Sequence, residues 1–445
     1  MTTRPLAVAR SAASVVTGRS ASGWRLGVLY GPAVYGVSAA AVALPDAAEH
    51  LDVRGSGLAW LLSAYAAGVG VGAVTAGRLV DLRGSRPVLL TGAASLTVGA
   101  LVCAVASTLP AVVIGRVLLA VGSGALMVTA LAGVAQLAAR RQKALAAFGA
   151  CLAGFSATAP LAGAVAAYGS WRAAIVLPVL SLAAVPLCWS LTAGSRRIDR
   201  VDWLAAGLLA AVAAGLLLTV QTAAQQAAWE GTVIAAVATA AAAASLAVRH
   251  RSRPFGIPPR GILSAAWFWR AAITGAGVYA GLFAVLYAAP HLLSRQGHST
   301  MSIGALLLPG AVIGAVLARL AARVARRPPA GRLLAGVNVL VAAALCYAAV
   351  DPRTLPVAAA CTAAFTASAV AQILLTARTT DNAAVHARGG AIGLLTLATF
   401  LGGGCGAALC ASLWQAWGPT VSLAAVAVLP AAWRRRSPAD GTTCA

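Results

Sequence analysis

Long apolar stretches separated by short polar breaks recur along the whole chain. Each stretch is about twenty residues long, the length that an α-helix needs to cross about 30 Å of hydrocarbon. The pattern predicts fourteen membrane-spanning helices, at residues 26–48, 57–79, 87–107, 110–138, 144–168, 172–193, 202–222, 229–249, 265–293, 301–325, 331–349, 354–377, 388–412 and 416–433. The weakest of these are the Ala-rich stretch 229–249 and the short last one. We therefore expect an all-α membrane protein.

The composition fits this expectation. Hydrophobic residues make up 60% of the chain and charged residues only 10%, whereas a soluble domain carries about 25% charged residues. The apolar stretches are rich in Ala, Leu, Val and Gly, and small side chains let helix backbones approach closely in lipid. An ordinary soluble domain is excluded, and a tight helical bundle is favoured.

The formal net charge of +23 arises largely from arginines in alternate loops. The clusters are Arg78, Arg83 and Arg86; Arg140, Arg141 and Lys143; Arg196, Arg197 and Arg200; Arg249, Arg251 and Arg253; Arg323, Arg326 and Arg327; and Arg434, Arg435 and Arg436. Basic residues collect in cytoplasmic loops, so the alternation predicts both termini in the cytoplasm of a cell whose plasma membrane holds the chain. This placement accounts for the charge, and we expect no nucleic-acid partner.

Other chemistry is sparse. The eight cysteines form no CxxC pair, and the five histidines stand alone without metal-ligand spacing. A membrane enzyme would need paired carboxylates, metal ligands or a nucleophile with its base, and ATP binding would need a Gly-Lys-Ser/Thr loop. We expect a monomer in the lipid bilayer that is not an enzyme and needs no cofactor or metal.

Two ten-residue loops resemble each other, the second being a diverged copy of the first. Residues 77–86 read GRLVDLRGSR, and residues 318–327, after the tenth predicted span, read ARLAARVARR. Repeated six-helix halves joined by a basic segment are the layout of many secondary transporters, in which the halves rock about a site near mid-membrane.

The first copy of this loop resembles the signature loop of the major facilitator superfamily, GxLaDrxGrr. The matching residues are Gly77, Leu79, Asp81, Arg83, Gly84 and Arg86. Glycines allow a tight turn between helices, and a carboxylate at the membrane surface can face a helix N-terminus or pair with arginines. In the family this loop latches the two halves together; the alternative is that Asp81 only balances loop charge.

Two further elements resemble the family. Arg116, with Gly122 and Gly124, is similar to its RxxxGxG-type element, which implies substrate or proton coupling; the alternative is an arginine that reaches the outer surface. Pro160 and Gly163 lie in a segment similar to the GPxxGG element of drug:proton antiporters. This implies export and a bent, closely packed helix, although small residues in a tight bundle are an adequate alternative.

The segment 200–203 resembles the point at which the fourteen-helix branch of these antiporters inserts two helices between its halves. The resemblance implies a major facilitator fold, with two six-helix bundles related by a pseudo-two-fold axis. The expected division is a cytoplasmic tail 1–25, a six-helix bundle 26–196, two inserted helices with a basic linker 197–260, a second six-helix bundle 261–433 and a tail 434–445.

One departure from this branch concerns proton coupling. The first span of the branch commonly carries an aspartate shortly before Ala-Leu-Pro, and the matching residue here is Gly36. All ten acidic residues lie in predicted loops or at span ends. Asp46 and Glu49, at the outer end of the first span, are therefore the candidate coupling residues, and simple solvation is their alternative role.

Polar side chains within the spans are the candidates for a substrate cavity: Tyr35, Ser38, Tyr65, Tyr279, Tyr287, His291 and Gln372. Because no fixed acidic charge is expected at the centre of the bundle, the cavity should be mostly apolar. The predicted function is secondary active export of small lipophilic or cationic compounds by proton antiport. The alternatives are an uncoupled facilitator or importer of the same fold and, less favoured, a membrane enzyme or sensor.

Overall fold

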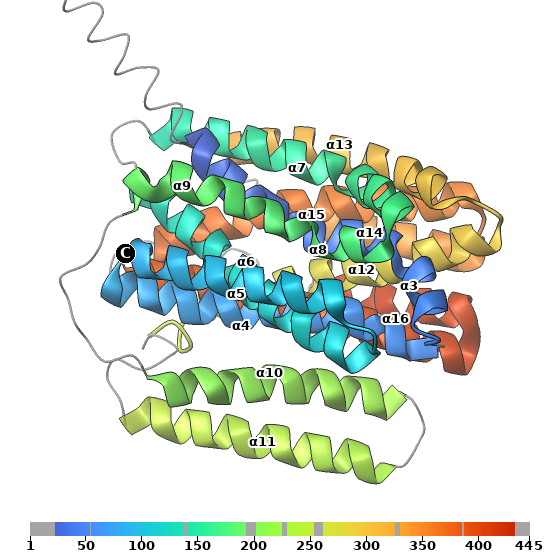
Figure 1. The fold of residues 1–445 in the computed structure, drawn as a ribbon, viewed down its shortest axis with the longest axis horizontal. Helices are drawn as coiled ribbons and strands as arrows, with labels where there is room; N and C mark the ends of the chain where they lie inside the picture. Colours follow the sequence, from blue (N-terminus) through green and yellow to red (C-terminus); the bar gives the residue numbers. More distant parts are fainter. Residues whose placement is uncertain are drawn as a thin grey trace, which may run out of the picture.

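The computed structural model describes residues 23–53, 55–136, 141–192, 202–224, 229–252, 261–324, 330–384 and 387–431. The expected tails, apart from residues 23–25, and the arginines at 140, 196–200, 253, 326–327 and 434–436 lie outside these ranges. The described chain folds into long helices that lie side by side along the longest axis of the molecule (Figure 1).

The first half of the chain contributes six helical crossings. A helix over residues 23–30 continues through η1 (Gly31–Val34) and α2 (Tyr35–Val42) into α3 (Leu44–His50). After η2 (Gly55–Leu58) follow α4 (Ala59–Arg83), α5 (Ser85–Val105), α6 (Leu109–Gln136) and α7 (Arg141–Gly169). The sixth crossing is composite: α8 (Trp171–Val176), η4 (Leu177–Ala184), α9 (Val185–Cys188) and η5 (Trp189–Leu191).

Two helices come between the halves of the chain: α10 (Trp203–Ala224) and α11 (Trp229–Ser252). The second half consists of α12 (Ala266–Arg295), α13 (Thr300–Val324), α14 (Ala330–Val350), α15 (Thr354–Asn382) and α16 (Arg388–Ala431). The 44 residues of α16 would measure about 66 Å as one straight helix, about twice the hydrocarbon thickness. Gly418 resolves this, because its backbone is non-helical (φ 79°, ψ 178°) and divides α16 into two segments.

The number of crossings among the described residues depends on how broken helices are counted. Twelve described helices are long and apolar enough to span a membrane, and the helix 23–42 with α3, bent by 63°, makes a thirteenth. After the break at Gly418, a shorter helical segment continues to Ala431, within the fourteenth predicted span. The two predicted spans with the weakest pattern are both helical, the first as α11 and the second as the segment after Gly418.

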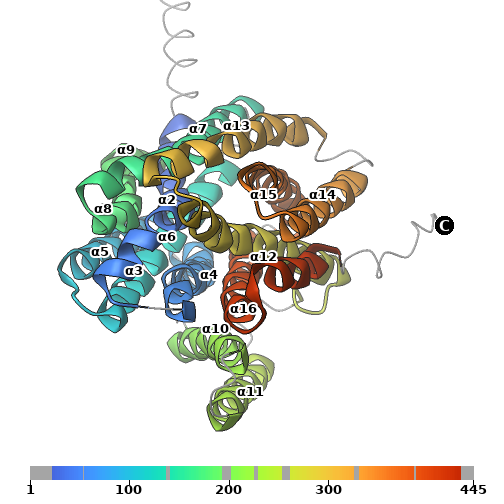
Figure 2. The ribbon, with the colours of Figure 1, turned by 90° about the vertical axis from the view of Figure 1, so that its right-hand side faces the viewer.

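The two halves lie next to each other, as the end-on view shows (Figure 2). Helices α2 to α9 form one group and α12 to α16 the other, and contacts between the groups run mainly along α4 with α16 and along α7 with α13. Glycines make the first of these seams close. A Cβ on Gly393 would lie 2.6 Å from the Ala73 carbonyl oxygen, so the two backbones touch with no room for a side chain.

The inserted pair packs outside the bundle. Helix α10 contacts both α4 and α16, so it covers the line where the two halves meet, while α11 packs mainly on α10. Asp202 joins the two helices: its carboxylate forms an ion pair with Arg249 at 2.8 Å and caps α10 by accepting a hydrogen bond from the backbone N–H of Ala205.

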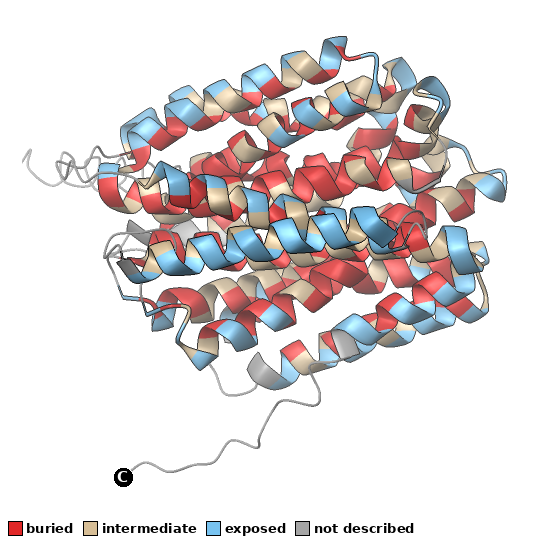
Figure 3. Ribbon diagram, turned by 90° about the horizontal axis from the view of Figure 1, so that it is seen from below, coloured by how far each residue is buried: buried red, intermediate tan, exposed pale blue. Residues whose placement is uncertain are grey.

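Burial follows this layering. Buried residues concentrate along the centre of the molecule, and exposed residues follow its outer helices (Figure 3). Many exposed side chains are large and apolar, such as Leu101, Val105 and Ile234. Water would penalise such a surface, whereas the hydrocarbon of a bilayer is its natural solvent.

Candidate functional site

Asp81 bridges the two halves at one end of the bundle, which we call the Asp81 end. Its carboxylate lies near the end of α4 and accepts hydrogen bonds from the backbone N–H groups of Gly389 (3.2 Å) and Gly390 (2.9 Å). These amides belong to the first turn of α16, where N–H groups lack helical partners and the helix dipole favours negative charge. A Cβ on Gly389 would lie 2.6 Å from Asp81 Oδ1, so this contact requires glycine.

The rest of the loop 77–86 supports this carboxylate. Gly84 ends α4 with a positive φ of 84°, a conformation that only glycine adopts readily. Arg86 donates from Nε to the Thr192 carbonyl oxygen (3.0 Å) and stacks over Trp189, which fixes the loop to the sixth crossing. Leu79 is half-buried and Arg83 is exposed. The loop thus has contacts in both halves, as the latch interpretation requires.

Arg116 is fully buried in the first half. Its guanidinium donates to the carbonyl oxygens of Gly36 (2.6 Å), Leu61 (3.1 and 2.9 Å) and Ile175 (3.1 Å), which belong to three other helices. Its exposed fraction is 0%, so the alternative of an arginine that reaches the surface is wrong. A buried cation must be paired or well hydrogen-bonded, and backbone carbonyls meet that need here.

Tyr65 fills the space where the branch carries its aspartate. A Cβ on Gly36 would overlap the phenol ring of Tyr65. That ring also stacks on Arg116, with 4.3 Å between the guanidinium carbon and the ring centroid, and its hydroxyl donates to the Ala33 carbonyl oxygen (2.9 Å). The missing carboxylate is therefore replaced by a carbonyl and an aromatic ring.

Pro160 and Gly163 lie where α7 meets two other helices. A Cβ on Gly163 would lie 2.6 Å from the Ala39 Cα of α2, and a Cβ on Gly304 of α13 would lie 2.9 Å from the Pro160 carbonyl oxygen. Small residues therefore allow α7 to contact both its own half and the other one.

Asp46 makes a contact between the halves at the opposite end, which we call the Asp46 end. Its half-buried carboxylate is hydrogen-bonded to the side chain of Thr300, the first residue of α13. Glu49 and His50 are its charged or titratable neighbours on α3, and His50 binds the Asp46 carbonyl oxygen through Nδ1 (2.8 Å). Glu49 itself is exposed. Only one of the two candidate coupling residues thus faces the other half.

An aromatic cluster occupies the middle of the bundle. Tyr279, near the middle of α12, packs against Phe283 and Phe400 with centroid distances of 6.4 and 5.4 Å. From the first half, Tyr30 lies close enough to Tyr279 to interact electrostatically, and it stacks edge-on against Phe148 (5.6 Å). The ring contacts of the cluster thus lie within the second half, and Tyr30 is its neighbour from the first half.

The polar candidates for the cavity fall into separate groups. Tyr279 donates to Gln372 Oε1 (2.7 Å), so these two lie together within the central cluster. Tyr35 shares a hydrogen bond with Thr158 of α7 (2.8 Å), and Ser38 donates to its own helix. The phenylalanines of the cluster were not predicted, because an apolar ring within a span carries no sequence signal that separates a cavity wall from the core.

Tyr287 and His291 lie apart from this cluster, toward the Asp46 end. Their rings are 4.7 Å apart and both contact Trp414, over which Arg295 also stacks. His291 Nδ1 is bonded to the Tyr287 carbonyl oxygen (2.8 Å). Within the described ranges, no group of three or more His, Cys, Asp or Glu side chains is arranged to hold a metal.

Comparison with known proteins decides the family. Residues 26–407, which make up most of the chain, match the Major Facilitator Superfamily. The chain belongs to the major facilitator superfamily. This major facilitator protein is thus a multi-pass membrane protein from a superfamily of transporters. The fold also resembles that of the human organic anion transporter MFSD10 (TETRAN), with a TM-score of 0.62 over 94% of this chain and 97% of the other, at 16% identity.

Its relatives include mycobacterial transporters. It is 27% identical to "Multidrug resistance protein Stp" of Mycobacterium tuberculosis over 316 residues, which cover 67% of this chain and 58% of the relative. It is also 27% identical to "Uncharacterized MFS-type transporter Rv1877" of the same species, over 66% of this chain and 45% of the relative. The match thus spans about half the length of these relatives. The major facilitator fold predicted from the sequence is confirmed.

Proposed function

We propose that this transporter exports small lipophilic or cationic compounds across the plasma membrane in exchange for protons. The observation that carries the proposal is the aromatic cluster of the second half beside Tyr30, which combines aromatic rings with a phenol hydroxyl and an amide. Within the described residues every acidic side chain lies at or near a helix end. Aromatic faces bind apolar bodies and cations. The likeness to a multidrug resistance protein and the Pro160 segment support export.

We further propose that the Asp81 end faces the cytoplasm, together with both termini. The described arginines of the clusters, including Arg78, Arg83 and Arg249, lie near helix ends on this side, and arginines favour the cytoplasmic surface. The Asp46 end then faces outward.

The two contacts between halves act as alternating latches in this proposal. At each end a carboxylate of the first half meets the first residues of a helix in the second half: Asp81 with α16, and Asp46 with α13. Alternating access requires one end to open while the other stays closed. Protonation of Asp46 removes the charge that holds the outer contact, so a proton from outside favours outward opening.

The test is transport in proteoliposomes with ethidium as a cationic aromatic probe. An imposed proton gradient should drive ethidium accumulation by the wild-type protein. Asp46→Asn should abolish the response to the gradient while downhill ethidium flux continues, and Glu49→Gln, the exposed neighbour, should behave as wild type. Wild-type flux that ignores the gradient would refute coupling, and absence of flux for ethidium and for neutral lipophilic dyes would refute export of such compounds.

One observation favours uncoupled facilitated diffusion as a second candidate. The residue at the usual aspartate position is Gly36, and Arg116 is already satisfied by carbonyl oxygens. Downhill flux with no accumulation in the same assay would support this alternative.

A further inference from the structure

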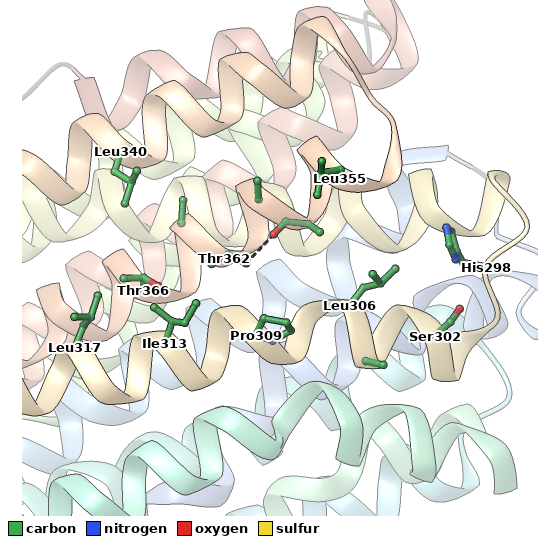
Figure 4. Close-up of a pocket in the computed structure, with 14 residues that line it drawn as sticks. His298, Ser302, Leu306, Pro309, Ile313, Leu317, Leu340, Leu355, Thr362 and Thr366 are labelled. Carbon is green, nitrogen blue, oxygen red and sulfur yellow. Dashed lines mark hydrogen bonds between the residues drawn. The ribbon is translucent and has the colours of Figure 1, made fainter.

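A groove lies on the outer surface of the second half, between α13 and α15. Its volume is about 790 Å³, within the range of sites for drug-sized molecules. Apolar side chains form its walls, as Figure 4 shows for Leu306, Ile313 and Leu317 on α13 and Leu355 on α15. Leu340 of α14 closes its far end. Because both helices span the membrane, the groove opens to lipid.

The polar groups at the mouth of the groove already have partners. His298 lies at the Asp46 end, where its Nε2 is bonded to Thr354 Oγ1 (3.0 Å), and that hydroxyl donates to Gln296 (2.7 Å). Ser302 donates to the Ser299 carbonyl oxygen (2.8 Å). The polar groups at the mouth therefore need no ligand to complete their hydrogen bonds.

The inner part of the groove differs. Thr366 lines it, is only 4% exposed, and its hydroxyl has no hydrogen-bond partner among the described residues. Thr362, one turn earlier on the same wall, instead donates to the Ala358 carbonyl oxygen (2.9 Å). Thr366 lies twelve residues after Thr354, where α15 begins, which places it about 18 Å deep. At that depth water is absent, and a hydroxyl without a partner is costly.

A backbone carbonyl is the polar group of the facing wall. Pro309 is inside α13 and lines the groove. Proline has no backbone N–H, so the carbonyl of Ala305, four residues earlier, lacks its helical hydrogen bond. Ala305 also lines the groove. The groove thus combines apolar walls with a carbonyl acceptor and a free hydroxyl.

We propose that this groove is a binding site for a lipophilic molecule that carries a hydroxyl or amine, taken up from the membrane leaflet at the Asp46 end. The apolar body lies along α13 and α15, and its polar group bonds to the Thr366 hydroxyl. A plain acyl chain would fill the same volume but would leave this hydroxyl unpaired. The site is separate from the central aromatic cluster, so the proposal does not depend on what the transporter exports.

Photolabelling of the full-length protein in phosphatidylcholine nanodiscs tests the proposal. The probes are 3-azioctanol and 3-azioctane, which share a photoreactive chain and differ by one hydroxyl. Adducts located by mass spectrometry should map to α13 and α15, with labelling by the alcohol about fivefold above the alkane, the ratio for one net hydrogen bond. Thr366→Val should bring this ratio close to one, whereas Thr362→Val, whose hydroxyl is already bonded, should leave it unchanged.

Controls separate binding from folding. Both valine variants should melt at the wild-type temperature, and Ala359→Leu, which narrows the groove, should lower labelling by both probes. Equal labelling of the wild type by the two probes would show a groove that holds only acyl chains and would overturn the proposal. The same holds if Thr366→Val keeps the preference for the alcohol.

Discussion

Replacing Asp81 by asparagine tests the latch between the halves. The carboxylate accepts two hydrogen bonds, from the backbone amides of Gly389 and Gly390, at the start of α16. Asparagine keeps one acceptor oxygen but presents an N–H₂ group to the second amide, and it loses the charge. One charge-assisted bond is worth about 1.5–3 kcal/mol, and the favourable helix terminus adds about 0.3–1 kcal/mol. We expect a net loss of about 2 kcal/mol, partly offset by the bond that remains.

This loss shifts the ratio of latched to unlatched molecules about thirtyfold toward the unlatched form. Electron-resonance distance measurements between spin labels at Leu90 and Asn382, with the exposed Cys346 replaced, would report the separation of the halves at the Asp81 end. Asp351→Asn is the matched control, because Asp351 lies at the other end in a loose, exposed pair with Arg353 (3.6 Å). If Asp81→Asn moves the distance distribution no more than this control does, the latch interpretation is wrong.

Three further substitutions probe the framework. Arg116→Lys keeps the charge, but its compact ammonium cannot reach the three carbonyl groups that are spread around the planar guanidinium. The melting temperature in detergent should therefore fall, by an amount corresponding to about 2–4 kcal/mol; an unchanged value would contradict the hydrogen bonding described. Gly36→Asp should be destabilising because Tyr65 fills its space, and adding Tyr65→Ala should recover part of the loss in the same measurement. Asp202→Asn should speed amide hydrogen exchange in α10, because it removes the ion pair with Arg249 and weakens the cap of α10. Exchange as slow as wild type would show that the ion pair does not hold the inserted helices.

The helices were predictable from the sequence because each crossing needs its own apolar run of about twenty residues. Apolar runs of the required length located even α11 and the short segment after Gly418. The sequence also singled out Asp81 and Arg116, since a carboxylate in a signature loop and an arginine inside a span stand out against an apolar background. These are local properties of the sequence, so they can be recognised before the fold is known.

The partners of these residues were not predictable. Asp81 binds backbone amides some three hundred positions away in the chain. Nearly every residue has a backbone amide, so the sequence does not show which ones act as partners. The backbone carbonyl groups around Arg116 cannot be identified from the sequence for the same reason. The sequence revealed only that an expected carboxylate was missing at Gly36. It could not show that Tyr65, on the next crossing, takes that space, because the contact depends on how α2 and α4 are packed.

The positions of the charges bear on how transport is coupled. Arg116 stacks on the ring of Tyr65 and its guanidinium nitrogens are hydrogen-bonded to carbonyl oxygens, so it is poorly placed to exchange a proton or to bind an anion. The two carboxylates that join the halves lie at opposite ends, both on the first half, and each faces the start of a helix in the second. Opening one end therefore breaks one contact and leaves the other intact, as alternating access requires. Protonation of the carboxylate at either end weakens the contact at that end and shifts this balance. In the proton antiport proposed above, coupling accordingly works at the mouths of the path, through Asp46 in particular, and not through an acid beside the substrate.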